Sequence, residues 1–213
     1  GFNRGLRELC GLHGAVFIAD EVLTGFRLSP AGYWGLAGQA EGWSPDLFTF
    51  GKVVGGGLPM SAVAGAAELM DLLAPAGPVY QAGTLSGNPA AAAAGLATLN
   101  LADDALYARL DHVGARLREM VSSALGQAGV PHRINHWGNL FSVFFTAAEV
   151  TDYDTAKTQD GAAFARFFHA MLDQGVWLAP SAFEAWFVSD ALGERELDVI
   201  AKALPPAARA AAG

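Results

Sequence analysis

The chain has 213 residues, a formal net charge of −8 and a pI of about 5.0, so one or two domains are expected. Its hydrophobic content of 52% excludes a disordered chain, and its acidic balance argues against nucleic acid or a membrane surface as partner. Apolar runs are short and broken by Gly and Pro, so no membrane-spanning helix is expected. Cys10 is the sole cysteine and no secretion signal is visible, which predicts a cytoplasmic protein without disulfides or a bound metal.

The composition is unusual for a free-standing domain. Charged residues make up 16% of the chain and glycine accounts for 26 residues. Ordinary soluble domains carry about 25% charged residues, so a partner subunit or further chain is expected to cover part of this surface. Because the first residue is Gly1 and not methionine, we expect a fragment of a longer protein.

The first part of the chain predicts an α/β arrangement. Helical spacing covers residues 2–12, and the apolar run at 15–19 predicts a strand buried on both faces, as in parallel sheets. Further strands are predicted at 46–50 and 61–65, followed by a short helix at 67–73.

A helix start is predicted at Asn88-Pro89, because asparagine caps helix N-termini and proline suits the first helical position. The alanine-rich helix that follows is nearly uncharged, so we expect it to be buried. A long amphipathic helix is predicted from Asp103 to about Gly126. The natural boundary lies near its start, which divides the chain into residues 1–98 and residues 99–213.

The second part predicts a smaller α+β domain. Strands are expected at 132–135, 140–146 and 176–178, and helices at 160–174 and from Glu194 onward.

Two charged residues stand at the ends of predicted strands. Asp20 follows the strand at 15–19, and Lys52 follows the strand at 46–50 and precedes a glycine-rich loop. The carboxyl edge of an open α/β sheet is where ligands bind, so the pair suggests one crevice. Pyridoxal phosphate needs such a pair: a lysine to form an imine and a carboxylate to keep the pyridine nitrogen protonated. The alternative is that Asp20-Glu21 forms a solvated turn after the strand and that Asp20 and Lys52 are ordinary surface residues.

Competing motifs do not fit. Gly51-Lys52 lacks the spacing of a phosphate-binding P-loop, and 83–87 is one residue too long for a nucleophile elbow. The glycines at 55–57 are not a dinucleotide fingerprint. His132 and His136 lack a third metal ligand, so both are interpreted as structural.

Four segments carry a resemblance to a known family: 18–27 (IADEVLTGFR), 46–59 (DLFTFGKVVGGGLP), 77–89 (GPVYQAGTLSGNP) and 178–189 (LAPSAFEAWFVS). They resemble the glutamate-1-semialdehyde 2,1-aminomutases, a branch of the class III aminotransferases of fold type I. The resemblance extends from residue 1 to about 205. Because the family's chains are longer, it implies a C-terminal half: the end of a cofactor-binding large domain with a mostly parallel sheet, then a small domain.

The resemblance implies a role for five residues. Lys52 resembles the Schiff-base lysine, and Asp20 resembles the acid that pairs with the pyridine nitrogen. Val22 would pack on one face of the cofactor ring. Thr84 resembles the threonine that reaches the cofactor phosphate of the neighbouring subunit in a homodimer. Glu184 resembles the glutamate that stands where related transaminases keep an arginine for a substrate carboxylate.

The implied reaction is intramolecular amino transfer from glutamate-1-semialdehyde to 5-aminolevulinate, a step of tetrapyrrole synthesis, with pyridoxal 5′-phosphate passing through its pyridoxamine form. An alternative is a class III transaminase acting on an ω-amino substrate. Between Val176 and Gly213 the only arginines are Arg195 and Arg209, which argues against a dicarboxylate-specific transaminase. A third possibility is an inactive half-chain that only dimerises.

Overall fold

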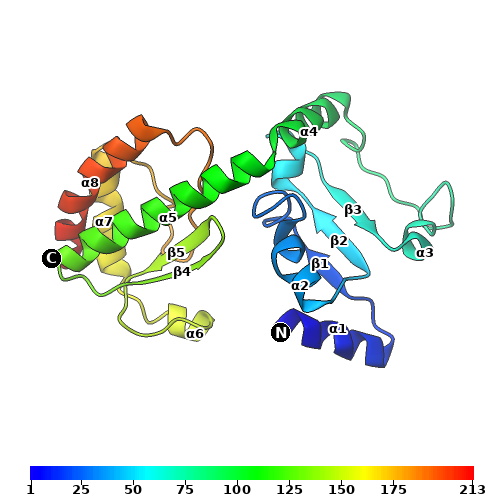
Figure 1. Ribbon diagram of the computed structural model, residues 1–213, viewed down its shortest axis with the longest axis horizontal. Helices are drawn as coiled ribbons and strands as arrows, with labels where there is room; N and C mark the ends of the chain where they lie inside the picture. The colour runs from blue at the N-terminus through cyan, green and yellow to red at the C-terminus, as the bar shows by residue number, and fades with distance from the viewer. The chain divides into compact units, whose positions relative to one another are not determined.

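A computed structural model describes residues 1–213 (Figure 1). The chain divides into two compact units, Gly1–Tyr107 and Ala108–Gly213, whereas the sequence placed the boundary between residues 98 and 99. None of the helices combines the length and the apolar composition that a membrane-spanning segment requires.

Unit 1 combines a small sheet with short helices. Its elements are α1 (Phe2–His13), β1 (Ile18–Asp20), the π-helical turn η1 (Trp34–Gly38), α2 (Gln39–Glu41), β2 (Leu47–Phe50), the 3-10 turn η2 (Lys52–Gly55), β3 (Ala62–Gly65), α3 (Ala67–Met70) and α4 (Pro89–Leu101). The predicted cap is confirmed, because the Asn88 side chain accepts hydrogen bonds from the backbone N–H groups of Ala90 and Ala91.

The sheet of unit 1 has the order β1-β2-β3. Strands β1 and β2 are parallel, with Asp20 opposite Thr49, which confirms the predicted parallel pairing there. Strand β3 runs antiparallel to β2, so the expectation of a mostly parallel sheet is wrong for this pair. The chain between them contains only the turn η2 and a loop, and without a crossover helix an antiparallel return is the accessible connection.

Two elements of unit 1 are more exposed than the sequence suggested. Ile18 in β1 is 51% exposed, because the main packing partner of β1 is its neighbour β2 rather than a covering helix. Helix α4 was expected to be buried, yet it buries only Ala91 and Gly95 and leaves Leu96 and Leu101 exposed. Its main packing partner is η2, which covers only one narrow stripe of the surface of α4.

Glycine permits the close packing of α4 on η2. A Cβ at Gly95 would collide with the carbonyl oxygen of Val54. Gly56 ends η2 with a φ of 57°, and a Cβ there would collide with the carbonyl oxygen of Ala94. These two positions therefore bring the helix backbone directly against the turn that begins at Lys52.

Unit 2 is built from helices and a two-stranded antiparallel sheet. The helix α5 (Asp104–Gln127) leads into it, and the further elements are β4 (Arg133–Trp137), β5 (Leu140–Phe144), α6 (Tyr153–Ala156), α7 (Gly161–Asp173) and α8 (Glu194–Ala212). Helices α7 and α8 pack extensively on one another.

The core of unit 2 contains large apolar side chains with almost no solvent exposure, among them Phe141, Phe167, Leu125 and Met171. Burying a side chain of this size stabilises a fold by about 1.5–3 kcal/mol. The predicted strand at 176–178 is absent. Strand β5 pairs with β4, and Phe141 also forms a bridge with Trp186, so the segment around Trp186 takes the place beside β5.

Candidate active site

Asp20 ends β1 at the carboxyl edge of the parallel pair. Its Oδ1 accepts a hydrogen bond from the Val22 backbone N–H at 2.9 Å and one from the Thr49 hydroxyl at 3.2 Å. Both bonds go to the same oxygen, so Oδ2 is available to a further donor. The side chain is exposed, and its direction is set from both strands.

Glu21 is the next residue, and only 3% of it is exposed. Its carboxylate accepts hydrogen bonds from the backbone N–H groups of Tyr33 and Trp34 at 3.0 and 2.8 Å, and a short one from the Thr24 hydroxyl. A solvated turn at Asp20-Glu21 is therefore wrong for Glu21. This buried carboxylate ties the loop after β1 to the start of η1.

The loop after β1 is also held by Tyr107. The Tyr107 hydroxyl donates a hydrogen bond to the carbonyl oxygen of Phe26 at 2.9 Å. Burial raises the pKa of this hydroxyl above 10.0, although the charge of Arg27 opposes the shift. The hydroxyl therefore stays protonated and remains a donor at neutral pH.

Lys52 follows β2 after one glycine and begins η2. Its φ of 48° lies in the left-handed region, which is uncommon for a residue with a long side chain. Strain of this kind persists only where surrounding structure enforces it, and it gathers at functional sites. The Lys52 side chain is exposed, so its amine is accessible.

Val22 connects the two strand ends. A Cβ at Gly51 would lie 3.2 Å from Cγ1 of Val22, so the valine side chain rests against the residue before Lys52. Asp20, Val22 and Gly51, the residue before Lys52, thus lie at one edge of the sheet.

Thr84 lies elsewhere in unit 1. It is exposed in a turn that includes a hydrogen bond from the Ser86 N–H to the Gly83 carbonyl oxygen at 2.9 Å. The turn lines a groove of about 650 Å³ together with Met60 and the start of α4. Asp20 borders a different cavity, so the chain by itself does not gather Thr84 with the carboxylate.

Glu184 belongs to unit 2 and is exposed at the end of a tight turn. Its Oε2 accepts a hydrogen bond from the Ser181 N–H at 3.1 Å, and its own N–H donates to the Ser181 carbonyl oxygen at 3.2 Å. Phe183 completes the turn by donating its N–H to the Ser181 hydroxyl. The carboxylate is thus presented on an ordered loop.

Sequence reasoning did not identify Thr49 or Glu21 as parts of this region. The position of Thr49 follows from strand register, because it is the residue paired with Asp20. Glu21 carried a weak signal: a second carboxylate directly after a strand, which only the loop at Tyr33 and Trp34 converts into a buried group.

Comparisons with known proteins give a consistent family. The profile of the family described as "Aminotransferase class-III" matches residues 1–204. The chain is 66% identical over 212 residues to a glutamate-1-semialdehyde 2,1-aminomutase of Propionibacterium freudenreichii subsp. freudenreichii, covering 100% of this chain and 48% of that protein. It is 58% identical to the protein of the same name from Cutibacterium acnes, covering 100% and 49%.

Solved structures show the same fold. An ω-transaminase from Sphaerobacter thermophilus superposes with a TM-score of 0.89 at 31% identity, covering 100% of this chain and 48% of that one. A glutamate-1-semialdehyde aminomutase variant from Pseudomonas aeruginosa PAO1 in complex with PMP gives a TM-score of 0.80 at 28% identity, covering 97% and 47%. These neighbours confirm the α/β fold that the sequence predicted.

The chain spans about half the length of the curated relatives that it matches. These coverages give the fraction of each relative that the chain matches. They do not support the narrower prediction that the chain is a C-terminal part. The family match covers nearly the whole chain. The chain therefore belongs to the class III aminotransferase family.

Proposed function

We propose that this chain forms part of a glutamate-1-semialdehyde 2,1-aminomutase, which moves an amino group within glutamate-1-semialdehyde to give 5-aminolevulinate for tetrapyrrole synthesis. The observation that carries the proposal is the 66% identity to an aminomutase over the whole chain. The positions of Asp20 and Lys52 at the ends of neighbouring strands agree with it. A cytoplasmic location belongs to the same proposal.

The cofactor of the proposal is pyridoxal 5′-phosphate, alternating with its pyridoxamine form. When bound, it supplies an electron sink for bond changes at the carbon that carries the amino group. The residues of this chain fit such a group, because Oδ2 of Asp20 is available to a pyridinium N–H while its other oxygen is already held. Val22 offers an apolar side chain beside that position. A related transaminase structure has PLP bound.

Lys52 is proposed to bind the cofactor covalently and to carry protons during the reaction. A primary amine on a flexible stem can reach both a carbonyl carbon and a neighbouring C–H. The fixed backbone of η2 limits where the stem begins, and the exposed amine leaves the end free to move. The positive φ of Lys52 costs some stability of the fold, and this agrees with a backbone conformation that directs the lysine side chain for a function.

Thr84 is proposed to contact the cofactor phosphate of a second subunit, with a homodimer as the working assembly. Its exposed hydroxyl in a turn of the polypeptide could serve as a hydrogen-bond donor to a phosphate oxygen. Thr84 and Asp20 line different cavities of this chain. This separation agrees with a contact between Thr84 and the cofactor of the second subunit.

Glu184 is proposed to select the substrate. A carboxylate in this position repels a second substrate carboxylate, whereas an arginine would bind one. The turn from Ser181 holds the carboxylate by the hydrogen bond to Oε2, so the group that repels has a defined direction.

A second candidate is transamination of an ω-amino substrate by the same residues. The structural similarity to an ω-transaminase, with a TM-score of 0.89, favours it. Identity to that structure is 31%, against 66% for the aminomutase from P. freudenreichii, so the aminomutase is the stronger proposal. The two differ in whether an external keto acid accepts the amino group.

Labelling of lysine tests the proposal. The chain contains Lys52, Lys157 and Lys202. The full-length protein is mixed with pyridoxal 5′-phosphate, reduced with borohydride, and digested for mass spectrometry. Modification of Lys52 alone is expected, and equal modification of all three lysines would contradict the proposal. Formation of 5-aminolevulinate from glutamate-1-semialdehyde, without an external keto acid, then separates the aminomutase from the ω-transaminase.

A further inference from the structure

Gln159 is a buried polar side chain of unit 2, with 9% of the residue exposed. Its Nε2 donates a hydrogen bond to the carbonyl oxygen of Ala182 at 3.2 Å. Its Oε1 accepts one from the backbone N–H of Phe145, the residue directly after strand β5, at 3.4 Å. One amide therefore joins the sheet to the turn that presents Glu184.

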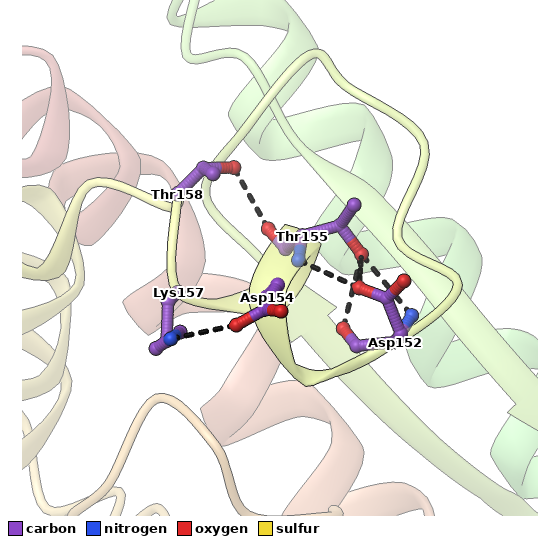
Figure 2. A network of polar contacts seen from close by, with 5 residues as sticks. All are labelled: Asp152, Asp154, Thr155, Lys157 and Thr158. Atoms are coloured by element: carbon purple, nitrogen blue, oxygen red, sulfur yellow. Dashed lines mark hydrogen bonds and ion pairs between the residues drawn. The ribbon is translucent and has the colours of Figure 1, made fainter.

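The backbone on both sides of Gln159 is fixed. The Asp160 N–H donates to the carbonyl oxygen of Phe145 at 2.9 Å, and the Asp160 side chain caps α7 by accepting from Ala162 and Ala163. Before Gln159, Figure 2 shows the polar network around α6, in which Asp152 and Thr155 form a reciprocal cap. The side chain therefore extends from a rigid anchor, as a positioning group requires.

The Glu184 turn has further anchors on the same structure. The ring of Phe183 lies 5.9 Å from the ring of Tyr153, a residue of α6. Beyond the turn, the Trp186 N–H donates to the Phe141 carbonyl oxygen at 2.6 Å. The Phe183 ring therefore holds the turn at its centre, and the Trp186 backbone holds the chain just after it. Gln159 binds the carbonyl oxygen of Ala182, two residues before Glu184.

We propose that Gln159 is a positioning residue for Glu184, which fixes the turn 181–184 so that the carboxylate points in one direction. The inference rests on the proposed role of Glu184 in substrate selection. A buried amide with both its ends bonded specifies one geometry, because leaving either partner unpaired in the interior is unfavourable. Gln159 acts through the turn and does not itself contact the substrate.

The test compares Gln159→Met with Gln174→Met in the full-length protein. Methionine matches glutamine in length and lacks both hydrogen bonds. Gln174 is the matched control: its Nε2 also donates to a backbone carbonyl, that of Ala170 at 3.2 Å, but at the exposed end of α7. Amide hydrogen exchange is measured for the peptide that contains residues 181–184.

Exchange in this peptide is expected to accelerate about tenfold in Gln159→Met, the equivalent of one lost hydrogen bond, and to stay unchanged in Gln174→Met. Unchanged exchange in both variants would overturn the proposal. If Gln159→Met does not fold, Gln159→Asn replaces it, because a side chain shorter by one methylene cannot span both partners.

A double-mutant cycle on kcat/KM distinguishes positioning of Glu184 from a general loss of stability. Gln159→Met and Glu184→Gln are each expected to lower the ratio of kcat/KM for glutamate-1-semialdehyde to kcat/KM for a dicarboxylate amino donor such as glutamate, and the double variant should discriminate no worse than Glu184→Gln. Independent, multiplicative losses would contradict action through Glu184. If Glu184→Gln has no effect while exchange still accelerates, the role of Glu184 fails and the anchoring by Gln159 stands.

Discussion

Asp20 and Thr49 face one another across the parallel strands β1 and β2, and the Thr49 hydroxyl donates a hydrogen bond to the Asp20 carboxylate at 3.2 Å. The strand register therefore places a donor from one strand against the proposed cofactor acid on the next. Since the Val22 N–H binds the same oxygen, the carboxylate is held from two sides.

Replacing Thr49 by valine should weaken cofactor binding. Valine keeps the branched shape that suits a strand and removes only the hydroxyl donor to Asp20. The affinity of the full-length protein for pyridoxal 5′-phosphate is expected to fall about five- to tenfold, measured by absorbance titration. Thr158→Val, which removes a hydroxyl bonded to the Thr155 carbonyl oxygen, is the control and should leave the affinity unchanged. Equal affinity for Thr49→Val and wild type would show that this bond does not orient Asp20.

Gly95 should be required for the position of Lys52. An added methyl group at Gly95 would collide with the Val54 carbonyl oxygen and push η2 away from α4. In Gly95→Ala, borohydride labelling of Lys52 is expected to fall about tenfold relative to Lys157 and Lys202, as expected for a site displaced by a clash of about 1–3 kcal/mol.

Gly126→Ala provides the matched control for that substitution. Gly126 lies in α5, and a Cβ added there would have no neighbouring atom within 4 Å, so the same change meets open space. It should leave labelling unaltered and stabilise the helix by about 0.5–1 kcal/mol, because alanine has the better helix propensity. A similar loss of labelling in both variants would exclude the close approach as the cause.

Because of Asp46, the free energy of unfolding of unit 1 should decrease at low pH. Its Oδ2 accepts hydrogen bonds from the Phe17 N–H at 2.7 Å and from Arg7 at 2.6 Å, and these hold its pKa below the ordinary value of 3.8. Stability from this group is therefore complete above pH 3.8 and is lost as the pH falls through the lower folded value. Asp46→Asn should cost about 1 kcal/mol at pH 7, a modest value because both side chains are partly solvated.

Urea unfolding at pH 7 and at successively lower pH checks this expectation. The difference between wild type and Asp46→Asn should shrink once the pH drops below 3.8. Glu8→Gln is the control, since the Arg4–Glu8 pair is exposed on both sides and should contribute almost nothing. A difference that grows toward low pH would mean that the sign of the linkage is wrong.

Arg166 should stabilise the end of α8. Its Nε donates to the Ala210 carbonyl oxygen at 2.9 Å and its Nη2 to the Ala211 carbonyl oxygen at 2.8 Å, where the helix has no further N–H groups to offer. Arg166→Ala is expected to lower the free energy of unfolding of unit 2 by about 1–2 kcal/mol, measured by urea denaturation. Lys202→Ala, an exposed change on α8, should have an effect close to zero, and equal losses in the two variants would argue against the cap.

Local chemistry alone predicted much of the secondary structure. Asn88 and Pro89 predicted the start of α4, and the apolar spacing predicted α5, because caps and amphipathic faces depend on nearby residues. Lys52 and Asp20 stood out by position, since charged residues seldom follow apolar strands without a reason. The motifs also indicated the family, which the match over residues 1–204 then established.

Tertiary structure decided what depends on residues far apart in sequence. The burial of Glu21 depends on Tyr33 and Trp34, and the segment at 176–178 forms no strand because Trp186 bridges to Phe141. The apolar composition of α4 predicts a buried helix, yet Leu96 is exposed in the structure. Composition indicates that a helix favours burial, but it does not determine which other segment packs against it. Periodicity and capping are properties of neighbours along the chain, whereas register, close approach and burial are fixed only when distant segments meet.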